Sequence, residues 1–595
     1  MAIFTPSESP AIIVKEIDLT GVVPNVQSTT GAIVGNFRWG PVEKATLVDN
    51  EGTLAARFGT PTDSNAVDFL SASYFLRYSN SLQVVRIVDT DSQDAGGAVN
   101  ARYPYIAAKD APLVKNAENF DTQLASLDSD RQVFIAKYPG VLGNSLKISI
   151  CPASGRDSGG TFILTDSAFS SWTYRSSFDG SPSTSEFASS VGASNDEIHL
   201  VVIDEDGLFS GTRGTVLETF PYMSLASNAK RADGSTNFVK DVVNSRSEYI
   251  WMSGFGTPGS IFDSAAGTEI DTNDNYWNAS RDEVLTVSFD SGANGGSLTT
   301  GDYLIGNDQF EDKDTITVDF LIAPGLSSSP DHVTVVNDLI SIATARKDCV
   351  VVASPNRAAV VNNAPSSIVD DTLNTMFDIS SSSYLFADNN YLKVYDKYND
   401  KYRFIPAASS TAGLMAATDL NAAPWFSPAG SRRGAYLGIT SLAYTPTKTQ
   451  RDTLYKGSVN PIANIPGQGV LLFGDKTGLL RPSAFDRINV RRLFLTVERA
   501  IALAARNVLF EFNDEFTRAE FVNIVEPFLR EIQGRRGITD FRVVCDETNN
   551  TPAVIDRNEF IATIFIKPAR SINYVTLNFV AVRTGVDFEE VVGTV

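Results

Sequence analysis

The alternation of apolar and polar positions predicts a strand, a helix and a second strand near the start of the chain. Residues 31–37 form a short apolar run of the kind found in buried strands. Residues 63–78 repeat apolar side chains at helical spacing, and residues 82–88 are again β-branched and apolar. This order of elements is typical of an α/β domain.

A second segment, far along the chain, repeats the same pattern. Residues 318–324 and 349–354 are apolar runs that predict strands. Between them, residues 331–347 have helical spacing, and Asp331 is the predicted N-cap. Because the two segments share one order of elements, we expect them to form a single domain.

Residues 92–310, which separate these segments, differ from both. Gly, Ser, Asp and Asn are frequent, and short strands alternate with long polar loops. The clearest predicted strands are 132–138, 146–150 and 198–204. We interpret 92–310 as a mainly β outer insertion, of one or two subdomains, into an α/β domain made of 23–91 and 311–378.

The serine run at 380–383 predicts a boundary before a C-terminal inner domain that spans 379–585. Helices are predicted at 487–506 and 515–533. Three strands are predicted after them, at 540–545, 559–567 and 572–583. This region is therefore α+β, and the whole chain is expected to be a multidomain protein with α/β and α+β parts.

Both ends of the chain have the pattern of strands that lack a local partner. Residues 11–19 are β-branched and partly alternating, and 586–595 is also extended in character. We expect an N-terminal arm at 1–22 and a C-terminal arm at 586–595. The apolar arm residues are Ile12, Ile13, Val14, Ile17, Leu19, Val586, Phe588, Val591 and Val592.

Composition narrows the classes of function. Lys and Arg number 49 against 70 Asp and Glu, a net charge of −21, so nucleic acid is not an expected partner. No run reaches the ~18 apolar residues of a membrane span, and the N-terminus lacks a secretory signal. Cys151, Cys349 and Cys545 are far apart, which predicts buried thiols. We expect a soluble protein, made in a cytoplasm, with no membrane contact.

Patterns that support catalysis or cofactor binding are weak. His199 and His332 belong to no zinc or triad motif. Residues 469–477 resemble a phosphate-binding loop, but Asp475 stands where the lysine should directly follow the second glycine. A carboxylate there would repel phosphate, so we expect a strand and a turn.

The acidic segments also fail to form a recognisable site. Residues 204–207 and 271–275 lack the spacing of an EF-hand loop. Adjacent carboxylates at 370–371 and 589–590 diverge in a helix or a strand, so they predict no acid and base pair. We expect no enzyme activity, no cofactor and no metal site, although a hydrolase whose carboxylates meet on folding stays an alternative.

One helix is basic against the acidic background. The predicted helix at 487–506 carries a single acid, Glu498. Its arginines are Arg487, Arg491, Arg492, Arg499 and Arg506. The opposite side carries apolar residues that predict a core face, Leu493, Phe494, Val497, Ile501, Ala504 and Ala505. The arginines form either a solvated face or a surface that binds an acidic protein.

Several blocks at both ends resemble the tail sheath proteins of myoviruses, above all those of T-even-like phages. The N-terminal blocks are 10–18, 31–37 and 40–41, where Ala11 replaces a glycine that is common in the family. The C-terminal blocks are 460–462, 491–511, 545–552, 567–574 and 583–585. Residues 92–310 show no residue-by-residue match.

The resemblance implies a structural subunit of a contractile tail sheath. Such subunits form stacked rings, hexameric in the family, around a tail tube, and contract from a metastable extended state to drive the tube through the host envelope. The implied partners are copies of the chain, the tube protein, the baseplate and the tail terminator. The implied location is the virion, after assembly in the host cytoplasm.

The resemblance also implies roles for particular segments. Both arms add strands to the C-terminal domains of neighbouring subunits, and residues 20–30 and those near Gly585 act as hinges. Arg487, Arg491, Arg492 and Arg499 are the expected tube-facing residues. A sheath from a tail-derived bacteriocin or injection device, or another virion structural protein, remains an alternative.

Overall fold

The computed structural model describes residues 29–90, 97–103, 111–124, 127, 133–153, 155–156, 162–163, 167–255, 266–269 and 284–573. These residues divide into two compact units. Unit 1 contains Ala423–Ser427 and the chain from Asn489 onward. Unit 2 contains the described chain up to Ala422 together with Pro428–Ile488.

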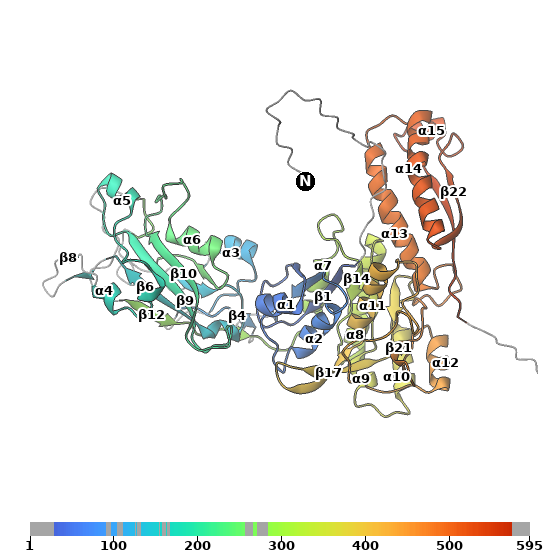
Figure 1. Ribbon diagram of the computed structural model, residues 1–595, viewed down its shortest axis with the longest axis horizontal. Coiled ribbons are helices and arrows are strands. Elements are labelled where there is room, and N and C mark those ends of the chain that lie inside the picture. The colour runs from blue at the N-terminus through green and yellow to red at the C-terminus, as the bar shows by residue number, and fades with distance from the viewer. Residues whose placement is uncertain are drawn as a thin grey trace, which may run out of the picture. The chain divides into compact units, whose positions relative to one another are not determined.

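Unit 2 is built on a six-stranded sheet (Figure 1). In spatial order its strands are β16 (Leu385–Ala387), β15 (Val350–Ala353), β14 (Phe320–Ile322), β1 (Gly31–Gly35), β3 (Leu82–Arg86) and β2 (Thr46–Val48). Only the β2 pairing is antiparallel. All residues of β1, β14 and β15 are buried, as is typical of parallel strands covered on both faces. Because β1 pairs with both β3 and β14, the two predicted strand, helix, strand segments share one sheet.

Helices from distant parts of the chain accompany this sheet. They are α1 (Glu51–Phe58), α2 (Ala66–Phe75), α7 (Thr300–Asp308), α8 (Ser329–Arg346), α9 (Arg357–Val360), α10 (Ile368–Asp378) and α11 (Ala408–Asn421). A Cβ atom on Gly306 of α7 would lie 2.5 Å from Cγ1 of Val34 in β1, so the close packing of α7 on β1 requires glycine. The helix α7 therefore packs on the sheet, although the sequence pattern assigns its residues to the insertion.

Helix α8 begins earlier than its sequence pattern predicts. Its N-cap is Ser328, not Asp331, which lies in the first turn. There the Asp331 carboxylate accepts a hydrogen bond of 2.9 Å from the Thr300 hydroxyl group. A carboxylate in the first turn also interacts favourably with the positive end of the helix dipole, so Asp331 stabilises the helix start without capping it.

The segment between β3 and α7 is dominated by a four-stranded antiparallel sheet. Its strands, in spatial order, are β10 (Thr215–Ser224), β9 (Glu197–Asp204), β6 (Leu146–Pro152) and β12 (Leu285–Ser288). A two-stranded sheet, β5 (Phe134–Ala136) with β11 (Ile250–Met252), and the helix α6 (Val239–Arg246) share its hydrophobic core. These strands give the described part of 92–310 a mainly β character, and its role as an outer insertion stays a prediction.

A fully buried arginine joins this segment to the six-stranded sheet. Arg86, at the end of β3, donates hydrogen bonds to the carbonyl oxygens of Phe37 (2.7 Å), Gly40 (2.9 Å), Arg38 (3.4 Å) and Pro139 (2.7 Å). Among the described residues no carboxylate forms an ion pair with it, and burial lowers the pKa of Arg86 to about 9. Since Pro139 lies just before β6, one guanidinium group ties together chain segments from both parts of unit 2.

The serine run at 380–383 does not separate two units. It connects α10 to β16, which pairs in parallel with β15 inside the same sheet. Unit 2 then continues through β17 (Tyr391–Asp396), β18 (Lys401–Pro406), β19 (Ser441–Leu442), α12 (Lys448–Lys456), β20 (Ile462–Ile465) and β21 (Gly469–Leu472). The predicted start of the inner domain at 379 thus differs from the structure, because a polar serine run also suits a short loop inside one domain.

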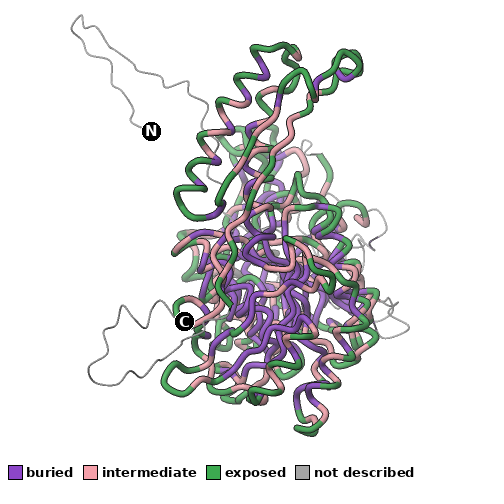
Figure 2. The backbone as a smooth tube through the Cα atoms, turned by 90° about the vertical axis from the view of Figure 1, so that its right-hand side faces the viewer, coloured by how far each residue is buried: buried purple, intermediate pink, exposed green. Residues whose placement is uncertain are grey.

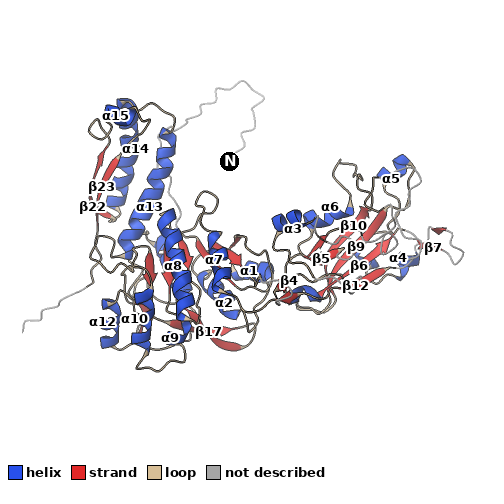
Figure 3. Cartoon of the chain, turned by 180° about the vertical axis from the view of Figure 1, so that it is seen from behind, coloured by secondary structure: helices blue, strands red, loops and turns tan. Residues whose placement is uncertain are grey.

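Unit 1 consists mainly of two long helices and one β-hairpin (Figure 3). The elements are α13 (Ile488–Ala505), α14 (Glu515–Gly534), β22 (Ile538–Val544), α15 (Pro552–Ile555) and β23 (Thr563–Pro568). The core includes Trp425, Leu493, Val497, Phe521, Val525, Leu529, Ile532 and Ile538. Both predicted helices and the first two predicted strands are present, whereas 572–573 is not a strand and 574–583 lies outside the described residues.

The two units differ in how far their residues are buried. Figure 2 shows buried backbone concentrated in unit 2, while the helices and hairpin of unit 1 carry many exposed and half-buried positions. Among the described residues, no helix has the length and apolar character needed to cross a membrane.

Candidate inter-subunit surface

The hairpin of unit 1 has two open edges. Strands β22 and β23 pair with each other over Ile538–Val544, and no third described strand joins them. Each strand therefore leaves a row of backbone N–H and C=O groups facing outward. Open edges of this kind are ready to pair with strands of another chain, and an isolated hairpin is marginally stable in water.

Only one face of this hairpin is covered by the unit itself. Phe541, Val543, Ile564 and Ile566 pack on the core that α13 and α14 form. On β23, Phe565 points away from this core and is 58% exposed. The hairpin is thus fixed to unit 1 by one face and remains open along its edges and on part of its other face.

The turn between α13 and α14 exposes a cluster of large apolar side chains, which we call the aromatic turn. Its members and their exposed fractions are Leu509 (62%), Phe510 (104%), Phe512 (83%) and Phe516 (77%). Phe510 also has a left-handed backbone, with φ of 72°, which is strained for a bulky side chain. Contiguous exposed apolar residues are typical of a surface that becomes buried on association.

Sequence reasoning did not find the aromatic turn as a site. The available signal is three phenylalanines within 510–516, directly after a predicted helix, where a solvated loop would be polar. In contrast, the predicted arm residues Ile12, Ile13, Val14, Ile17, Leu19, Val586, Phe588, Val591 and Val592 lie outside the described residues. Their role as strands that bind a neighbour stays a prediction.

The arginines of α13 do not form one exposed face. Arg491 and Arg492 are only 7% and 4% exposed. Arg487, just before the helix, donates hydrogen bonds to the Tyr455 hydroxyl (2.6 Å) and to Asp475 (3.1 Å). Arg499 is half-buried and Arg506 is exposed. Spacing along the helix predicted a common stripe, but burial separates its members: Arg491 and Arg492 are buried, as are the adjacent Val490 and Leu493.

Both histidines are buried. In His199, Nδ1 accepts from the Tyr222 backbone N–H (3.0 Å), so Nε2 carries the hydrogen and donates to the Gly180 carbonyl (2.9 Å). His332 in α8 is 1% exposed, and burial lowers its pKa to about 4. Both side chains therefore serve packing, and that of His199 also serves local hydrogen bonding. Neither faces a cluster of metal ligands in the described part of the chain.

The three cysteines are buried free thiols, as their spacing predicted. Burial raises the pKa of Cys151 to about 12, and it also raises the pKa of Cys349 and Cys545. A thiol with a raised pKa is largely protonated at neutral pH and is a poor nucleophile.

The near match to a phosphate-binding loop is occupied by protein contacts. β21 ends at Leu472, and the carboxylate of Asp475 then accepts hydrogen bonds from Tyr455 and Arg487. The Lys476 ammonium group donates to the Tyr455 carbonyl (2.6 Å), and Thr477 donates to that of Phe485 (2.8 Å). The predicted strand is confirmed, the residues directly after it have no regular structure, and the lysine side chain is held by a hydrogen bond within the protein.

Of the acidic segments, the one at 204–207 is a structural turn. Asp204 is buried and accepts hydrogen bonds from the Ser145 hydroxyl group and from the backbone of Leu208, Phe209 and Ser210. Asp370 and Asp371 lie in the first turn of α10. Residues 271–275 and 589–590 lie outside the described residues.

Comparison with known proteins gives one consistent result. The chain matches the phage tail sheath protein central domain over residues 296–478 and the phage tail sheath C-terminal domain over residues 481–581. The tail sheath protein of Enterobacteria phage T4 is 33% identical, over 98% of this chain and 99% of that protein. The tail sheath protein of Vibrio phage KVP40 is 32% identical, with the same coverage of 98% and 99%.

A solved structure shares the fold at low identity. The crystal structure of a sheath tail protein from Listeria innocua has a TM-score of 0.51 and 12% identity, and covers 91% of this chain and 96% of that one. At this identity the likeness shows a common fold.

A mixed α and β multidomain architecture, with an open hairpin and an exposed aromatic turn, is typical of the class of structural subunits that function in assemblies. Identity over nearly the full length specifies the family: the chain belongs to the phage tail sheath proteins and is the sheath protein of a contractile phage tail. Proteins of this kind are components of the virion.

Proposed function

We propose that this chain polymerises into stacked rings around a tail tube and contracts from a metastable extended state, which drives the tube through the host envelope. The observation that carries the proposal is the open hairpin β22–β23, a half-covered element that donor strands would complete. Added strands would stabilise the hairpin because they form hydrogen bonds with the backbone N–H and C=O groups that are unpaired on each edge.

The donor strands are the two arms. Residues 11–19 and 586–595 are rich in β-branched and apolar side chains that suit a strand with one covered face. Exchange of strands between subunits keeps them connected while their domains rotate, since the arm and the domain that it completes move together. Residues 20–30 and those near Gly585 act as the hinges.

The domain organisation follows from the same proposal. The α/β domain contains the described chain up to β3, helix α7 and the chain from β14 to β16, the β segment between β3 and α7 forms the outer part of the sheath, and unit 1 is the inner sheath domain that receives the strands. The partners are copies of this chain, in hexameric rings, with the tube, baseplate and terminator proteins. Assembly takes place in the host cytoplasm, and the chain performs no catalysis.

Contraction in this scheme needs no nucleotide. The extended sheath is a kinetically trapped polymer, and subunits reach a state of lower free energy as they tilt and bury more surface. The engagement of Lys476 and Thr477 in local hydrogen bonds supports this view, because the one segment that resembles a nucleotide loop is otherwise used. The sequence identity of 32% and 33% with two phage sheath proteins, over 98% of this chain, favours a phage tail over an injection device.

Proline substitutions in the arms test strand donation. Val14→Pro and Val591→Pro each remove a backbone donor inside a predicted donor strand, so we expect regular polymers to be lost. Ser7→Pro is the matched control, because it lies in the Pro-rich start before the strand. Electron microscopy of purified protein, alone and with tube protein, provides the readout.

Contractile tubes of normal appearance from both arm variants would contradict the proposal. Loss of polymers in Ser7→Pro as complete as in Val14→Pro would also contradict the proposal, since the effect would then not depend on the predicted strand.

A further inference from the structure

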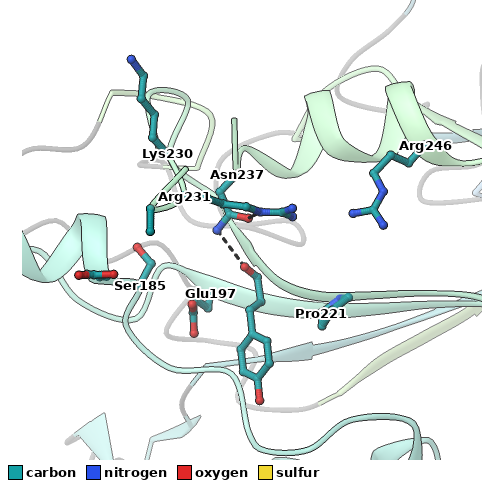
Figure 4. Close-up of a pocket in the computed structure, with 10 residues that line it drawn as sticks. Ser185, Glu197, Pro221, Lys230, Arg231, Asn237 and Arg246 are labelled. Carbon is teal, nitrogen blue, oxygen red and sulfur yellow. Dashed lines mark hydrogen bonds between the residues drawn. The ribbon is translucent and has the colours of Figure 1, made fainter. Parts of the chain in front are cut away.

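A pocket of about 400 Å³ lies in the β segment of unit 2, far in sequence from the hairpin and the arms (Figure 4). It is formed by the helix α5 (Glu186–Val191), the strands β9 and β10 and the loop before α6. Its lining includes three cationic side chains, Lys230, Arg231 and Arg246, and two carboxylates, Glu186 and Glu197. Nothing in the proposed assembly mechanism uses this pocket.

A bulge in β10 shapes one wall of the pocket. The register between β9 and β10 shifts between Phe220 and Met223, so Pro221 and Tyr222 leave the regular ladder. Tyr222 has φ of 50°, a left-handed conformation that is unusual for an aromatic residue. Its conformation is held by bonds from its backbone N–H to His199 (3.0 Å) and from its hydroxyl to Asp179 (2.7 Å). Bulges and strained residues of this kind cluster at sites where a side chain must be re-aimed.

Two guanidinium groups face each other in the pocket. The Asn237 amide donates to the Tyr222 carbonyl (2.9 Å), and its oxygen accepts from Nε of Arg231 (3.0 Å). This chain of hydrogen bonds orients Arg231, and Figure 4 shows its terminal nitrogens directed toward those of Arg246, at the end of α6. Among the described residues, no carboxylate forms an ion pair with either guanidinium, although Arg231 is close enough to Asp233 to help lower the pKa of that carboxyl group.

This arrangement favours an anion between the two arginines. Like charges that converge repel each other, and the planar fork of arginine matches the two oxygens of a carboxylate. Deeper in the pocket, Glu197 is fixed by the Ser183 backbone N–H (3.0 Å), so it is positioned to accept hydrogen bonds. The pocket thus combines an anion-binding side with acceptors for hydroxyl groups, next to the apolar ring of Pro221.

We propose that this pocket binds a sugar acid, a monosaccharide unit that carries a carboxylate. The carboxylate lies between Arg231 and Arg246, ring hydroxyl groups donate to Glu197 and Glu186, and the sugar ring packs against Pro221. The volume suits a single such unit. The outer segment of the sheath subunit would then attach the tail weakly to acidic glycans.

Ligand-observed NMR and calorimetry on the full chain test this proposal with D-glucuronate as the probe. Glucose, which has the same ring without the carboxylate, and acetate, which has only the carboxylate, are the reference ligands. We expect glucuronate to bind at least about tenfold more tightly than either. Arg231→Gln and Arg246→Gln should each weaken glucuronate binding by about tenfold, and Arg231→Lys should also weaken it, because the fork is lost although the charge is kept.

Arg213→Gln is the matched control. It removes one arginine charge from the same β segment, but Arg213 pairs with Asp206 outside the pocket. Because Arg231 and Arg246 are both exposed at the surface, their variants are expected to melt at the temperature of the unmodified protein. Equal affinity for glucuronate and glucose, equal affinity for glucuronate and acetate, or an Arg213→Gln effect as large as that of Arg246→Gln would each overturn the proposal.

Discussion

The central sheet of unit 2 and the hairpin of unit 1 both contain apolar strands, but they differ in how many strand edges are paired and how many faces are covered. Each strand from β15 to β3 in the sheet has neighbours on both sides, and most of its side chains are buried. The hairpin has one covered face and two open edges. The difference indicates that unit 2 is stabilised by contacts within the chain. Unit 1, in contrast, exposes strand edges and apolar side chains that contacts with other chains can bury.

Truncation of one phenylalanine in each unit should separate these two roles most clearly. Phe69 in α2 is 1% exposed, so Phe69→Ala should lower the free energy of unfolding of unit 2 by about 3–5 kcal/mol, through lost burial and a cavity. Phe512→Ala in the aromatic turn should change it by less than about 0.5 kcal/mol. Urea unfolding measures both.

The same pair should behave in the opposite way during assembly. At a temperature where both variants are folded, Phe512→Ala should slow polymer formation, followed by light scattering, more than Phe69→Ala does. Equal effects of the two variants on unfolding would contradict the division of roles.

The second prediction concerns Arg86, which connects the six-stranded sheet of unit 2 to the β segment. Arg86→Met removes a guanidinium that four carbonyls share, three of them in buried hydrogen bonds, so it should cost about 3 kcal/mol of unfolding free energy. Arg57→Met is the control, because Arg57 is exposed and makes one bond of 3.3 Å to the Leu47 carbonyl. Chemical denaturation of both variants checks this, and similar losses would show that Arg86 is not a joint.

Acid should weaken unit 2 through His332. Its pKa is about 4 in the folded chain and about 6.5 when unfolded, so the unfolded state binds the extra proton between these values. The contribution of the neutral histidine is complete above pH 6.5 and is lost as the pH falls toward 4, by up to about 3 kcal/mol.

His332→Leu should flatten this part of the pH profile of thermal unfolding. Both histidines of the chain belong to unit 2, so unit 1 has no equivalent group. A profile between pH 4 and 6.5 that is the same with and without His332 would refute the assignment.

The smallest expected effect tests whether surface ion pairs hold unit 1 together. Arg530 pairs with Glu526 along α14 at 3.2 Å, with both side chains exposed. Arg530→Gln should change the free energy of unfolding by only about 0.3–0.5 kcal/mol, as is usual for such pairs. A loss several times larger, in low-salt denaturation, would mean that charges rather than its thin core stabilise unit 1.

The sequence predicted best where one periodic signal dominates. β1, β3, α8 and α14 have clear apolar spacing, and each lies within about three residues of its expected place. Helix α7 was assigned to the wrong segment because TGDYLIGND has few apolar positions, and its packing depends on Gly306 instead. The serine run at 380–383 predicted a domain boundary, but the structure has a loop inside one domain there, because composition cannot distinguish a linker between domains from such a loop.

For the candidate surface, the sequence predicted less. Arginine spacing on α13 predicted a common face, but burial depends on tertiary neighbours that spacing does not encode. The aromatic turn was visible as a cluster of phenylalanines, yet an exposed cluster and a buried one look alike in sequence. The strands expected at each end of the chain lie outside the described residues, so their pairing with a neighbour stays a prediction.

Hydrogen–deuterium exchange of the hairpin tests the central claim most directly. Peptides that cover Ile538–Val544 and Thr563–Pro568 should exchange rapidly in the unassembled chain, because half of their backbone groups face water. In assembled sheath they should become strongly protected, as donor strands pair with both edges. Unchanged exchange of these peptides between subunit and sheath would contradict strand donation to this hairpin.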